Sequence, residues 1–392
     1  MKTNTFLILG GYGNTGSVLA RFLLQESSLN LVLAGRNESR AIATASEFNR
    51  LFPGERVSGR QADASDPASL RQAFQEVDLV VVASSTAQYA REVAEAALQV
   101  GIDYLDVQFS SQKVSILKSL APEIERLGRC FITEGGFHPG LPAALVRFAA
   151  ARVDQLQKAN VGSFIKIDWS SLDLPDDTVI ELIEELNDFE ATVFKEGHWK
   201  KVSMLSTIEF LTMDFGEPFG SQTCAPMFLE ELRSLPAAIP GLEETGFFVG
   251  SFNSFVDWVV MPLAMVALKP LPPQSPHRPV RTLRAAVLKA AGRLLRWGLR
   301  SFSHPPYQTI LKVEAQGLKD GRVKNLSVCI SHPDGYAFTA IPVAACLLQY
   351  LDGSIQKPGL WTQANLVEPG RLLEDMQRMG IQVQIQESPA KA

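Results

Sequence analysis

Cysteine is scarce in this chain of 392 residues. Its four cysteines, Cys130, Cys224, Cys329 and Cys346, lie far apart, and no two of them form a CxxC pair. This spacing supplies neither a disulfide framework nor a zinc cluster, so we expect no metal site. It fits a reducing compartment, and we expect a cytoplasmic protein.

Long apolar runs are lacking as well. The longest, 258–268, contains Pro262, whereas a membrane-spanning helix needs about 20 apolar residues. The apolar run at 6–9 is shorter than the stretch of about 7 to 15 residues that a signal peptide requires. We therefore expect no export signal and no membrane-spanning helix.

Charge is moderate and nearly balanced. The chain has 37 Lys and Arg against 42 Asp and Glu, a net charge of −5, and 46% of its residues are hydrophobic. This composition provides a substantial core, makes disorder improbable and disfavours bulk nucleic-acid binding. At roughly 100 to 200 residues per domain, the length predicts two or three domains.

A glycine-rich loop follows the first predicted strand. The run 6–9 leads into Gly10-Gly11-Tyr12-Gly13-Asn14-Thr15-Gly16, and a helical pattern over 17–24 and an apolar strand at 29–34 follow. Gly11-x-Gly13-x-x-Gly16 therefore has the spacing and context of a dinucleotide-binding fingerprint. Gly13 lets the backbone approach a pyrophosphate, and Gly16 lets the helix pack closely on the strand. We predict cofactor binding over Gly11–Gly16, with a structural turn as the alternative.

The residues after the second strand bear on the choice of cofactor. An NAD-selective protein usually places an acid there for the ribose 2′-OH, but this chain has Ala34-Gly35-Arg36-Asn37. A cation at Arg36 can pair with a 2′-phosphate. We therefore predict that Arg36 and Asn37 bind NADP(H). The alternative is a solvated arginine at the start of a helix.

Further polar residues follow later strands. Asp63 ends a strand at 56–62, while Ser84 and Ser85 follow the Val- and Leu-rich strand 77–83. The carboxyl ends of parallel strands face the ligand crevice. Asp63 would then reach the adenine, and the serines the ribose or phosphates. As plain helix caps, these residues need no ligand.

Four titratable side chains are candidates for the reactive end of the cofactor. Tyr104 and Asp106 lie on the strand 102–107, and Glu134 and His138 lie in the loop after the strand 130–133. His138 is the first candidate for proton transfer because its unperturbed pKa is near neutrality. Tyr104 and Asp106 come next.

The second half has longer strands and hairpin signals. Strands are predicted at 160–169, at 192–202 across Glu196-Gly197, and at 307–330 across Asp320-Gly321. Helices follow at 343–351 and 369–379, then a short strand at 381–385. We predict an α/β protein whose domains are a Rossmann domain at 1–140, an α+β domain with a mainly antiparallel sheet at 141–330, and C-terminal elements at 331–392.

Several of these segments resemble the saccharopine dehydrogenase-like family. They are 10–24, Ala34-Gly35-Arg36-Asn37, 101–107, Gly135-Gly136-Phe137-His138-Pro139-Gly140-Leu141 and Lys357-Pro358-Gly359-Leu360-Trp361. The resemblance implies a Rossmann domain completed by C-terminal elements and a middle domain over the cofactor. It also implies NADP(H)-dependent oxidoreduction, often at an amine, imine or related carbon. A nucleotide-binding regulator without turnover is the alternative.

The stretch 168–190 departs from what an amino-diacid substrate requires. It contains nine acids and no Lys or Arg, whereas such a substrate needs cations near the nicotinamide. A solvated acidic helix face is the preferred interpretation, ahead of a polycation-binding site. The substrate is expected to be small and either lipophilic or an amine or imine.

The segment 258–313 has the opposite charge pattern. It contains no Asp or Glu and nine cations, which are Lys269, Arg278, Arg281, Arg284, Lys289, Arg293, Arg296, Arg300 and Lys312. At helical pitch, four cations share one stripe and apolar residues share another. The region 258–304 is therefore a candidate for peripheral contact with an anionic membrane. A surface helix packed on the core is the alternative, and the sequence leaves a homodimer open.

Overall fold

A computed structural model describes residues 4–168, 183, 190–202, 209–250, 253, 255–271 and 277–389. The chain forms two compact units, one comprising 1–151 and 336–383 and the other 152–335 and 384–392. The sequence had suggested boundaries near 140 and 330. The helix α6 (Pro142–Ala150) instead belongs to the first unit, and most of the last strand belongs to the second. The acidic stretch 168–190 lies almost wholly outside the described residues.

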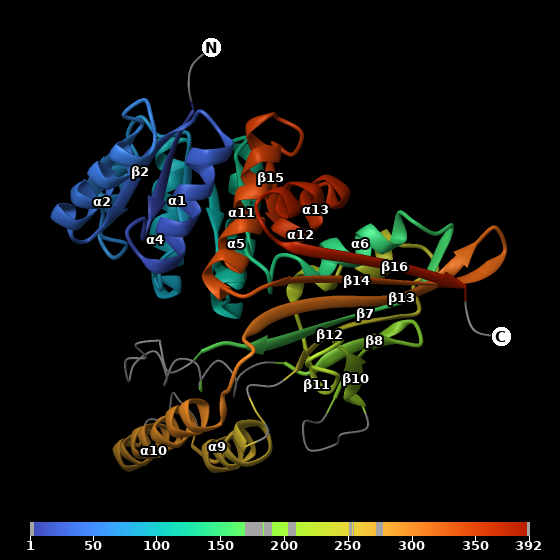
Figure 1. Ribbon diagram of the computed structural model, residues 1–392. Coiled ribbons are helices and arrows are strands. Elements are labelled where there is room, and N and C mark those ends of the chain that lie inside the picture. The colour runs from blue at the N-terminus through green and yellow to red at the C-terminus, as the bar shows by residue number, and fades with distance from the viewer. Residues whose placement is uncertain are drawn as a thin grey trace. The chain divides into compact units, whose positions relative to one another are not determined.

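The first unit is built on a parallel sheet of seven strands (Figure 1). Their order is β15-β6-β5-β4-β1-β2-β3, so the chain reverses its direction of travel across the sheet beside β1. The strands are β1 (Thr5–Leu9), β2 (Asn30–Gly35), β3 (Val57–Gln61), β4 (Leu79–Val82), β5 (Asp103–Asp106), β6 (Cys130–Thr133) and β15 (Gly359–Thr362). Ligands of open α/β sheets bind at such a reversal, outside the carboxyl ends of the strands.

Helices alternate with these strands. They are α1 (Asn14–Glu26), α2 (Glu38–Leu51), α3 (Pro67–Ala73), α4 (Ala90–Val100), preceded by the short turn η1 (Ala87–Tyr89), and α5 (Ser111–Arg126). Leu7 and Leu9 of β1 pack in one cluster with residues of α3, α4 and α5. Phe6 points to the other face, where its ring lies 5.8 Å from that of Tyr350. Both faces are thus buried, which explains the wholly apolar β4.

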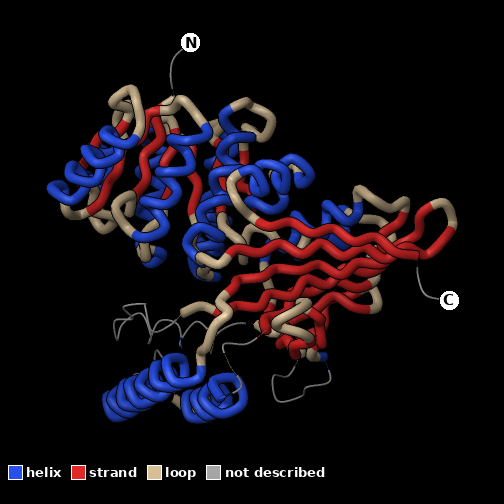
Figure 2. Tube along the Cα trace, in the orientation of Figure 1, coloured by secondary structure: helices blue, strands red, loops and turns tan. Residues whose placement is uncertain are grey.

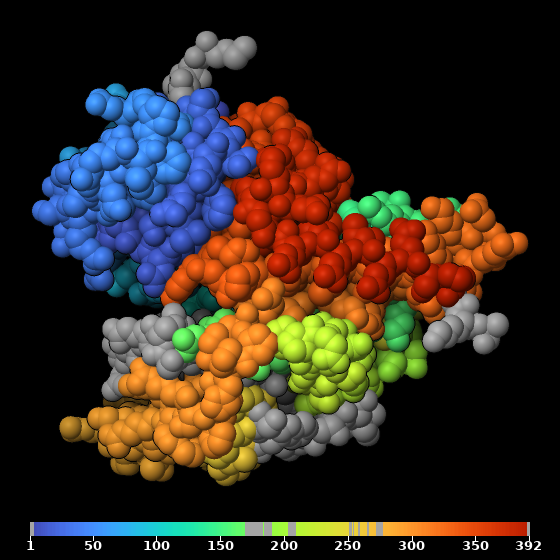
Figure 3. Space-filling model, in the orientation of Figure 1, coloured from blue at the N-terminus to red at the C-terminus, as the bar shows by residue number. Residues whose placement is uncertain are grey.

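C-terminal elements complete this unit, as the sequence predicted. They are α11 (Gly335–Leu351), whose first residue is assigned to the second unit, α12 (Gln363–Leu366) and α13 (Pro369–Arg378). Tyr350 of α11 donates a hydrogen bond to Asp103 Oδ2 at 2.5 Å, and β15 pairs with β6. In the space-filling view, blue N-terminal and orange-red C-terminal residues of this unit share one surface (Figure 3). The helix α11 begins eight residues before the predicted 343, with Pro342 inside it.

The second unit contains a mixed and mostly antiparallel sheet (Figure 2). Its strands are β7 (Gln155–Lys166), β8 (Thr192–Lys195), β9 (His198–Lys201), β10 (Leu211–Asp214), β11 (Ser221–Met227), β12 (Glu244–Gly250), β13 (Gln308–Lys319), β14 (Arg322–His332) and β16 (Gln382–Pro389). The predicted hairpins at Glu196-Gly197 and Asp320-Gly321 are present, with positive φ at all four residues. The α/β class and the antiparallel character of this sheet are confirmed.

Helices of the second unit carry the basic segment. A π-helical turn η4 (Val256–Val260) runs into α9 (Met261–Leu268), and α10 (Arg278–Phe302) follows. The short helices η3 (Glu230–Leu232) and α8 (Leu235–Ala238) lie between β11 and β12. Within the described part of the chain, no helix combines the length and apolar character that crossing a membrane demands.

Candidate functional site

The glycine loop lies at the carboxyl end of β1 and is compact. Gly10 N–H donates to Ala34 O at 2.8 Å, and Gly13 N–H donates to Gly10 O at 2.9 Å. A Cβ on Gly16 would stand 2.2 Å from Gly10 O, so helix and loop approach as closely as only glycine permits. A Cβ on Gly13 would meet nothing nearer than Gly10 O at 3.1 Å. Gly16 is therefore needed for packing, whereas space remains beside Gly13 for a ligand.

The first turn of α1 is open to an anion. Gly13 occupies its N-cap position and no side chain caps it, whereas Asn37, Asp66 and Ser110 cap α2, α3 and α5. The first N–H groups of a helix carry partial positive charge and need acceptors. Asn14 and Thr15 lie in this turn, and Asn14 Nδ2 donates to Tyr336 Oη of α11 at 3.0 Å. These groups fit a pyrophosphate.

A pocket of about 540 Å³ lies beside the loop, between the end of β2 and the start of α2. Its lining residues are Tyr12, Arg36, Asn37, Glu38, Ser39, Arg40 and Gln61. The pocket thus contains two guanidinium groups, one carboxylate and the N-terminus of α2. Its net positive charge suits a phosphate monoester. Arg36 and Asn37 lie where the sequence placed them, and the structure adds Ser39 and Arg40.

Tyr12 joins the glycine loop to this pocket. Its hydroxyl accepts a hydrogen bond from Asn37 N–H at 3.0 Å, and the Arg40 guanidinium lies over its ring, 5.0 Å from the centroid. A Cβ on Gly35 would stand 2.5 Å from the Tyr12 hydroxyl, so Gly35 makes room for the ring. Asn37 Oδ1 accepts from Arg40 N–H at 3.0 Å. The pocket is therefore preorganised by two backbone N–H hydrogen bonds and a cation–π contact.

Asp63 is held by its own turn. Its Oδ1 accepts from Ser65 N–H at 2.9 Å and from Ser65 Oγ at 2.8 Å. These hydrogen bonds, together with the charge of Arg36, lower the pKa of Asp63. Its hydrogen bonds with Ser65 are those of a structural turn, and contact with adenine stays a prediction.

The loop after β4 lies against the glycine loop. A Cβ on Gly10 would stand 2.9 Å from Ser84 Cβ. Ser84 Oγ is 2.9 Å from Thr86 Oγ1, and Gln108 Nε2 donates to Ser84 O at 2.6 Å. Ser85 is exposed. The structure thus brings Ser84 to the predicted pyrophosphate site, with Ser85 next to it in the chain.

Asp106 lies in a buried polar network. Lys113 of α5 donates to Asp106 Oδ1 at 2.5 Å, and both side chains are fully buried. Thr133 Oγ1 donates to Asp106 Oδ2 at 2.8 Å, and Lys113 also donates to Gln108 O. A carboxylate held in this way has structural contacts on both oxygens. Its placement argues against Asp106 as a proton donor and favours it as a positioning residue for the Gln108 loop.

Tyr104 lies in the hydrophobic core. The side chain is fully buried, and its ring stacks on Phe131 with centroids 5.0 Å apart. Burial, with the nearby negative charge of Asp106, raises the pKa of Tyr104 well above its usual value. This placement argues against the catalytic role that the sequence suggested, because the hydroxyl is buried.

His138 lies in the glycine-rich loop between β6 and α6. Gln363 Nε2 of α12 donates to Gly136 O and Gly140 O, each at 3.1 Å, which fixes both ends of this loop. The ring centroid of Phe137 lies 4.0 Å from that of His138 and 4.9 Å from that of Phe338. His138 is partly exposed, but its Nε2 is buried.

Burial lowers the pKa of His138 to about 4, so the ring is neutral at pH 7. A pKa near neutrality, the reason for selecting His138 from the sequence, is therefore absent in this structure. Glu134, next to the same loop, is buried and has a φ of 57°.

Comparison with known proteins identifies this sheet and loop. Residues 6–130 match the family model described as the saccharopine dehydrogenase NADP binding domain. Over these residues the first unit is similar to a saccharopine dehydrogenase NADP-binding domain. Its cofactor is NADP(H), as the sequence predicted. No curated protein matches the chain.

Solved structures extend the likeness to the whole fold. The apo, histidine-tagged saccharopine dehydrogenase (L-Glu forming) from Saccharomyces cerevisiae matches with a TM-score of 0.68 and 16% identity, over 98% of this chain and 100% of that chain. A myo-inositol dehydrogenase from Corynebacterium glutamicum matches with a TM-score of 0.44 and 11% identity over 100% of both chains. The first match shows a shared fold, and nothing rests on the second.

Sequence reasoning missed Arg40, Ser39, Lys113 and Gln363. A signal for Ser39 and Arg40 was present, because Asn37 is a typical N-cap and the next three residues form the first helical turn. Lys113 and Gln363 gave no such signal, since only tertiary packing brings them to Asp106 and Gly136. Among the residues that the structure describes, no cluster of His, Cys, Asp or Glu is suited to hold a metal ion.

Proposed function

We propose that this protein is an NADP(H)-dependent oxidoreductase. The observation that carries the proposal is the pocket containing Arg36 and Arg40 at the N-terminus of α2, beside the uncapped first turn of α1. A 2′-phosphate fits the pocket, and a pyrophosphate fits the turn. NADP(H), when bound, supplies or accepts a hydride.

The proposed substrate is small and either lipophilic or an amine or imine. The family of the NADP-binding domain supports a substrate of the amine or imine type. The chain must bind this substrate, exclude water and move one proton. His138 remains the proposed proton-transfer residue, in the direction where a neutral ring accepts a proton from the substrate. A proton-donating role requires that ligand binding raise its pKa.

The proposal is tested in two steps. Calorimetric titration of the purified protein with NADPH and NADH comes first, and we expect NADPH to bind at least tenfold more tightly. Consumption of NADPH is then followed across a panel of imines, short amino-aldehydes and apolar enones. Equal affinity for the two cofactors would contradict the assignment of Arg36 and Arg40.

The alternative is a regulatory protein that binds NADP(H) without turnover. It is supported by the burial of Tyr104 and Asp106, which argues against a catalytic role for two of the three predicted groups. Tight NADPH binding without oxidation by any panel member, and with no loss of bound NADPH over hours, would favour this alternative.

A further inference from the structure

The helix α10 has three distinct faces. One is buried and includes Leu288, Leu295 and Leu299, which pack against η4 and α9 in one cluster. A second is apolar but exposed: Leu283 is 54% exposed, Leu294 36% and Trp297 53%. At 100° per residue this exposed stripe lies about 150° from the buried face. A helix with one core-facing stripe does not need the second one for folding.

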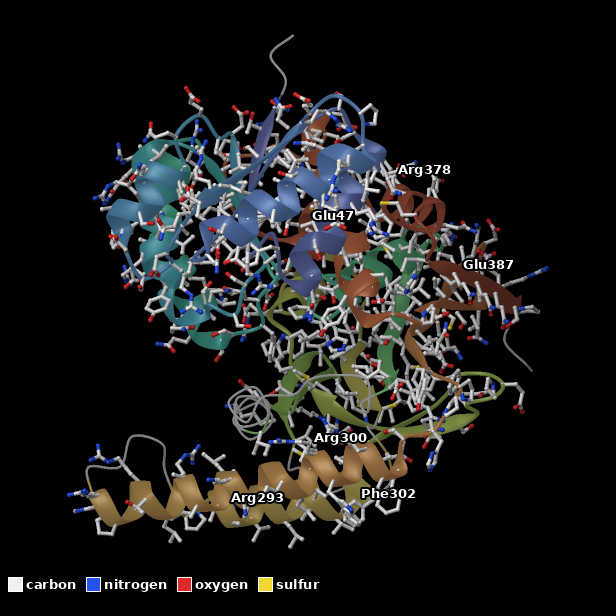
Figure 4. The ribbon with its side chains drawn as sticks, turned by 60° about the vertical axis from the view of Figure 1, so that its left-hand side comes forward. Glu47, Arg293, Arg300, Phe302, Arg378 and Glu387 are labelled. Atoms are coloured by element: carbon white, nitrogen blue, oxygen red, sulfur yellow. The ribbon has the colours of Figure 1, made fainter. Side chains whose placement is uncertain are left out.

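Cations form the third face. Lys289, Arg293 and Arg300 lie within a narrow arc at helical pitch, next to Trp297 on the side away from the buried face. Figure 4 shows Arg293 and Arg300 along α10. Of the salt bridges formed by the described residues, none involves Lys289, Arg293 or Arg300. Because no acid occurs from 258 to 313, their charge has no counterpart within the segment.

The neighbouring elements η4 and α9 also expose apolar side chains. Val259 of η4 and Leu263 and Val266 of α9 are 40%, 58% and 63% exposed. An aromatic cluster connects the two helices: the ring of Phe255 lies 5.3 Å from that of Trp297 and 5.0 Å from that of Phe302. Phe302 itself is 44% exposed. We call these seven exposed residues, Val259, Leu263, Val266, Leu283, Leu294, Trp297 and Phe302, the apolar stripe.

We propose that the apolar stripe inserts into the headgroup region of an anionic membrane, with Lys289, Arg293 and Arg300 pairing with lipid phosphates. Trp and Phe beside Leu and Val bury well at the boundary of headgroups and acyl chains, and arginines reach the phosphates from the flank. This surface lies outside the NADP-binding domain, so the inference does not rest on the proposed function.

Charge favours a lipid surface over other occupants. A second copy joined through the same face would bring two cationic stripes together, since a two-fold interface places like patches against each other. A nucleic acid would use the cations but leave the apolar stripe in water. An anionic bilayer satisfies both at once.

The test is sedimentation of the full chain with vesicles. Vesicles of 30% phosphatidylserine in phosphatidylcholine are compared with pure phosphatidylcholine vesicles, at low and high NaCl. We expect tight binding only to the anionic vesicles, at least tenfold weaker at high salt because screening shortens the Debye length.

Variants separate the two parts of the surface. Arg293→Glu/Arg300→Glu should weaken binding at least 30-fold, and Leu294→Ser/Trp297→Ser should weaken it at least tenfold without changing NADPH affinity. The matched control is Arg21→Glu/Arg50→Glu, two exposed cations of α1 and α2, which makes the same change in net charge and should keep binding.

Three outcomes would overturn the proposal: no sedimentation of the wild type at low salt, equal binding to neutral vesicles, or equal loss in the control variant. If the Leu294→Ser/Trp297→Ser variant instead converts a dimer to a monomer, with no vesicle binding by the wild type, the stripe is an interface between copies.

Discussion

The guanidinium of Arg40 lies over the ring of Tyr12, 5.0 Å from its centroid. This contact joins a residue of the glycine loop to the first turn of α2, so the proposed pyrophosphate and 2′-phosphate positions are held together before any ligand arrives. Such preorganisation reduces the entropy lost on binding.

Arg36→Ala and Arg40→Ala should each lower NADPH affinity by roughly ten- to a hundred-fold, because each removes a charge-assisted contact to the 2′-phosphate. NADH lacks this phosphate, so its affinity should stay within about twofold. Titration of both cofactors against both variants checks this. Arg50→Ala, an exposed arginine at the other end of α2, is the control. An equal loss of NADH affinity would show that these arginines support the fold of the loop instead.

Gly13→Ala and Gly16→Ala should have different effects, the first on cofactor binding and the second on stability. The Gly13 Cβ would crowd only Gly10 O, at 3.1 Å, so this variant should lose little of its melting temperature but lose cofactor binding. The Gly16 Cβ would collide with Gly10 O, so Gly16→Ala should cost about 2 kcal/mol or more of unfolding free energy. Thermal unfolding and NADPH titration of both variants measure this. Unchanged binding in Gly13→Ala would make the loop a structural turn only.

Lys113→Met should destabilise the protein by about 3 to 5 kcal/mol, because it leaves the Asp106 carboxylate buried without its partner. Adding Asp106→Asn removes that charge and should restore part of the loss. Urea unfolding of the two single variants and the double variant measures the coupling. If Asp106→Asn instead loses turnover while keeping full stability, Asp106 acts in catalysis and the structural assignment fails.

His138 should make stability fall at acidic pH. Its folded pKa of about 4 lies below the unfolded value of 6.5, so the unfolded state binds the proton more strongly. The neutral ring therefore makes its full contribution to the free energy of unfolding above pH 6.5. This contribution, up to roughly 3 kcal/mol, is lost as the pH falls toward 4. His138→Gln removes this titration. Unfolding free energies of both proteins at pH 7 and 4.5 should diverge, and parallel curves would disprove the shift.

The elements that local pattern specifies were predictable from the sequence. Alternating strands and helices up to 133, the glycine loop and the Asp320-Gly321 hairpin all follow from periodicity and turn residues. Pro342 misled the prediction of α11, since proline usually starts a helix rather than lying within one. Its backbone nitrogen cannot donate, but the apolar residues around it are buried and the helix continues.

The residues of the candidate site were predictable only where they lie close together in one sequence motif. The glycine loop and Arg36 are local, and in the structure Tyr12 of the loop and Arg36 line one pocket, while their contact with a cofactor stays a prediction. Tyr104 and Asp106 were selected for their chemistry at a strand end, but burial depends on distant partners such as Phe131 and Lys113, which the sequence does not rank. The lowered pKa of His138 was not predictable for the same reason, because it is caused by burial.

The hydrogen bonds from Gln363 to Gly136 and Gly140 determine how late in synthesis this loop can complete its folding. Gln363 lies 227 positions beyond Gly136, so at roughly 5 to 20 residues per second the loop waits about 10 to 45 s on the ribosome for its donor. During this interval the edge of β6 lacks β15 as well, and an unpaired edge is a template for association with other chains. During synthesis the protein thus passes through a stage at which it is prone to association with other chains. Most of the first unit has then been made, but it still lacks β15 and Gln363.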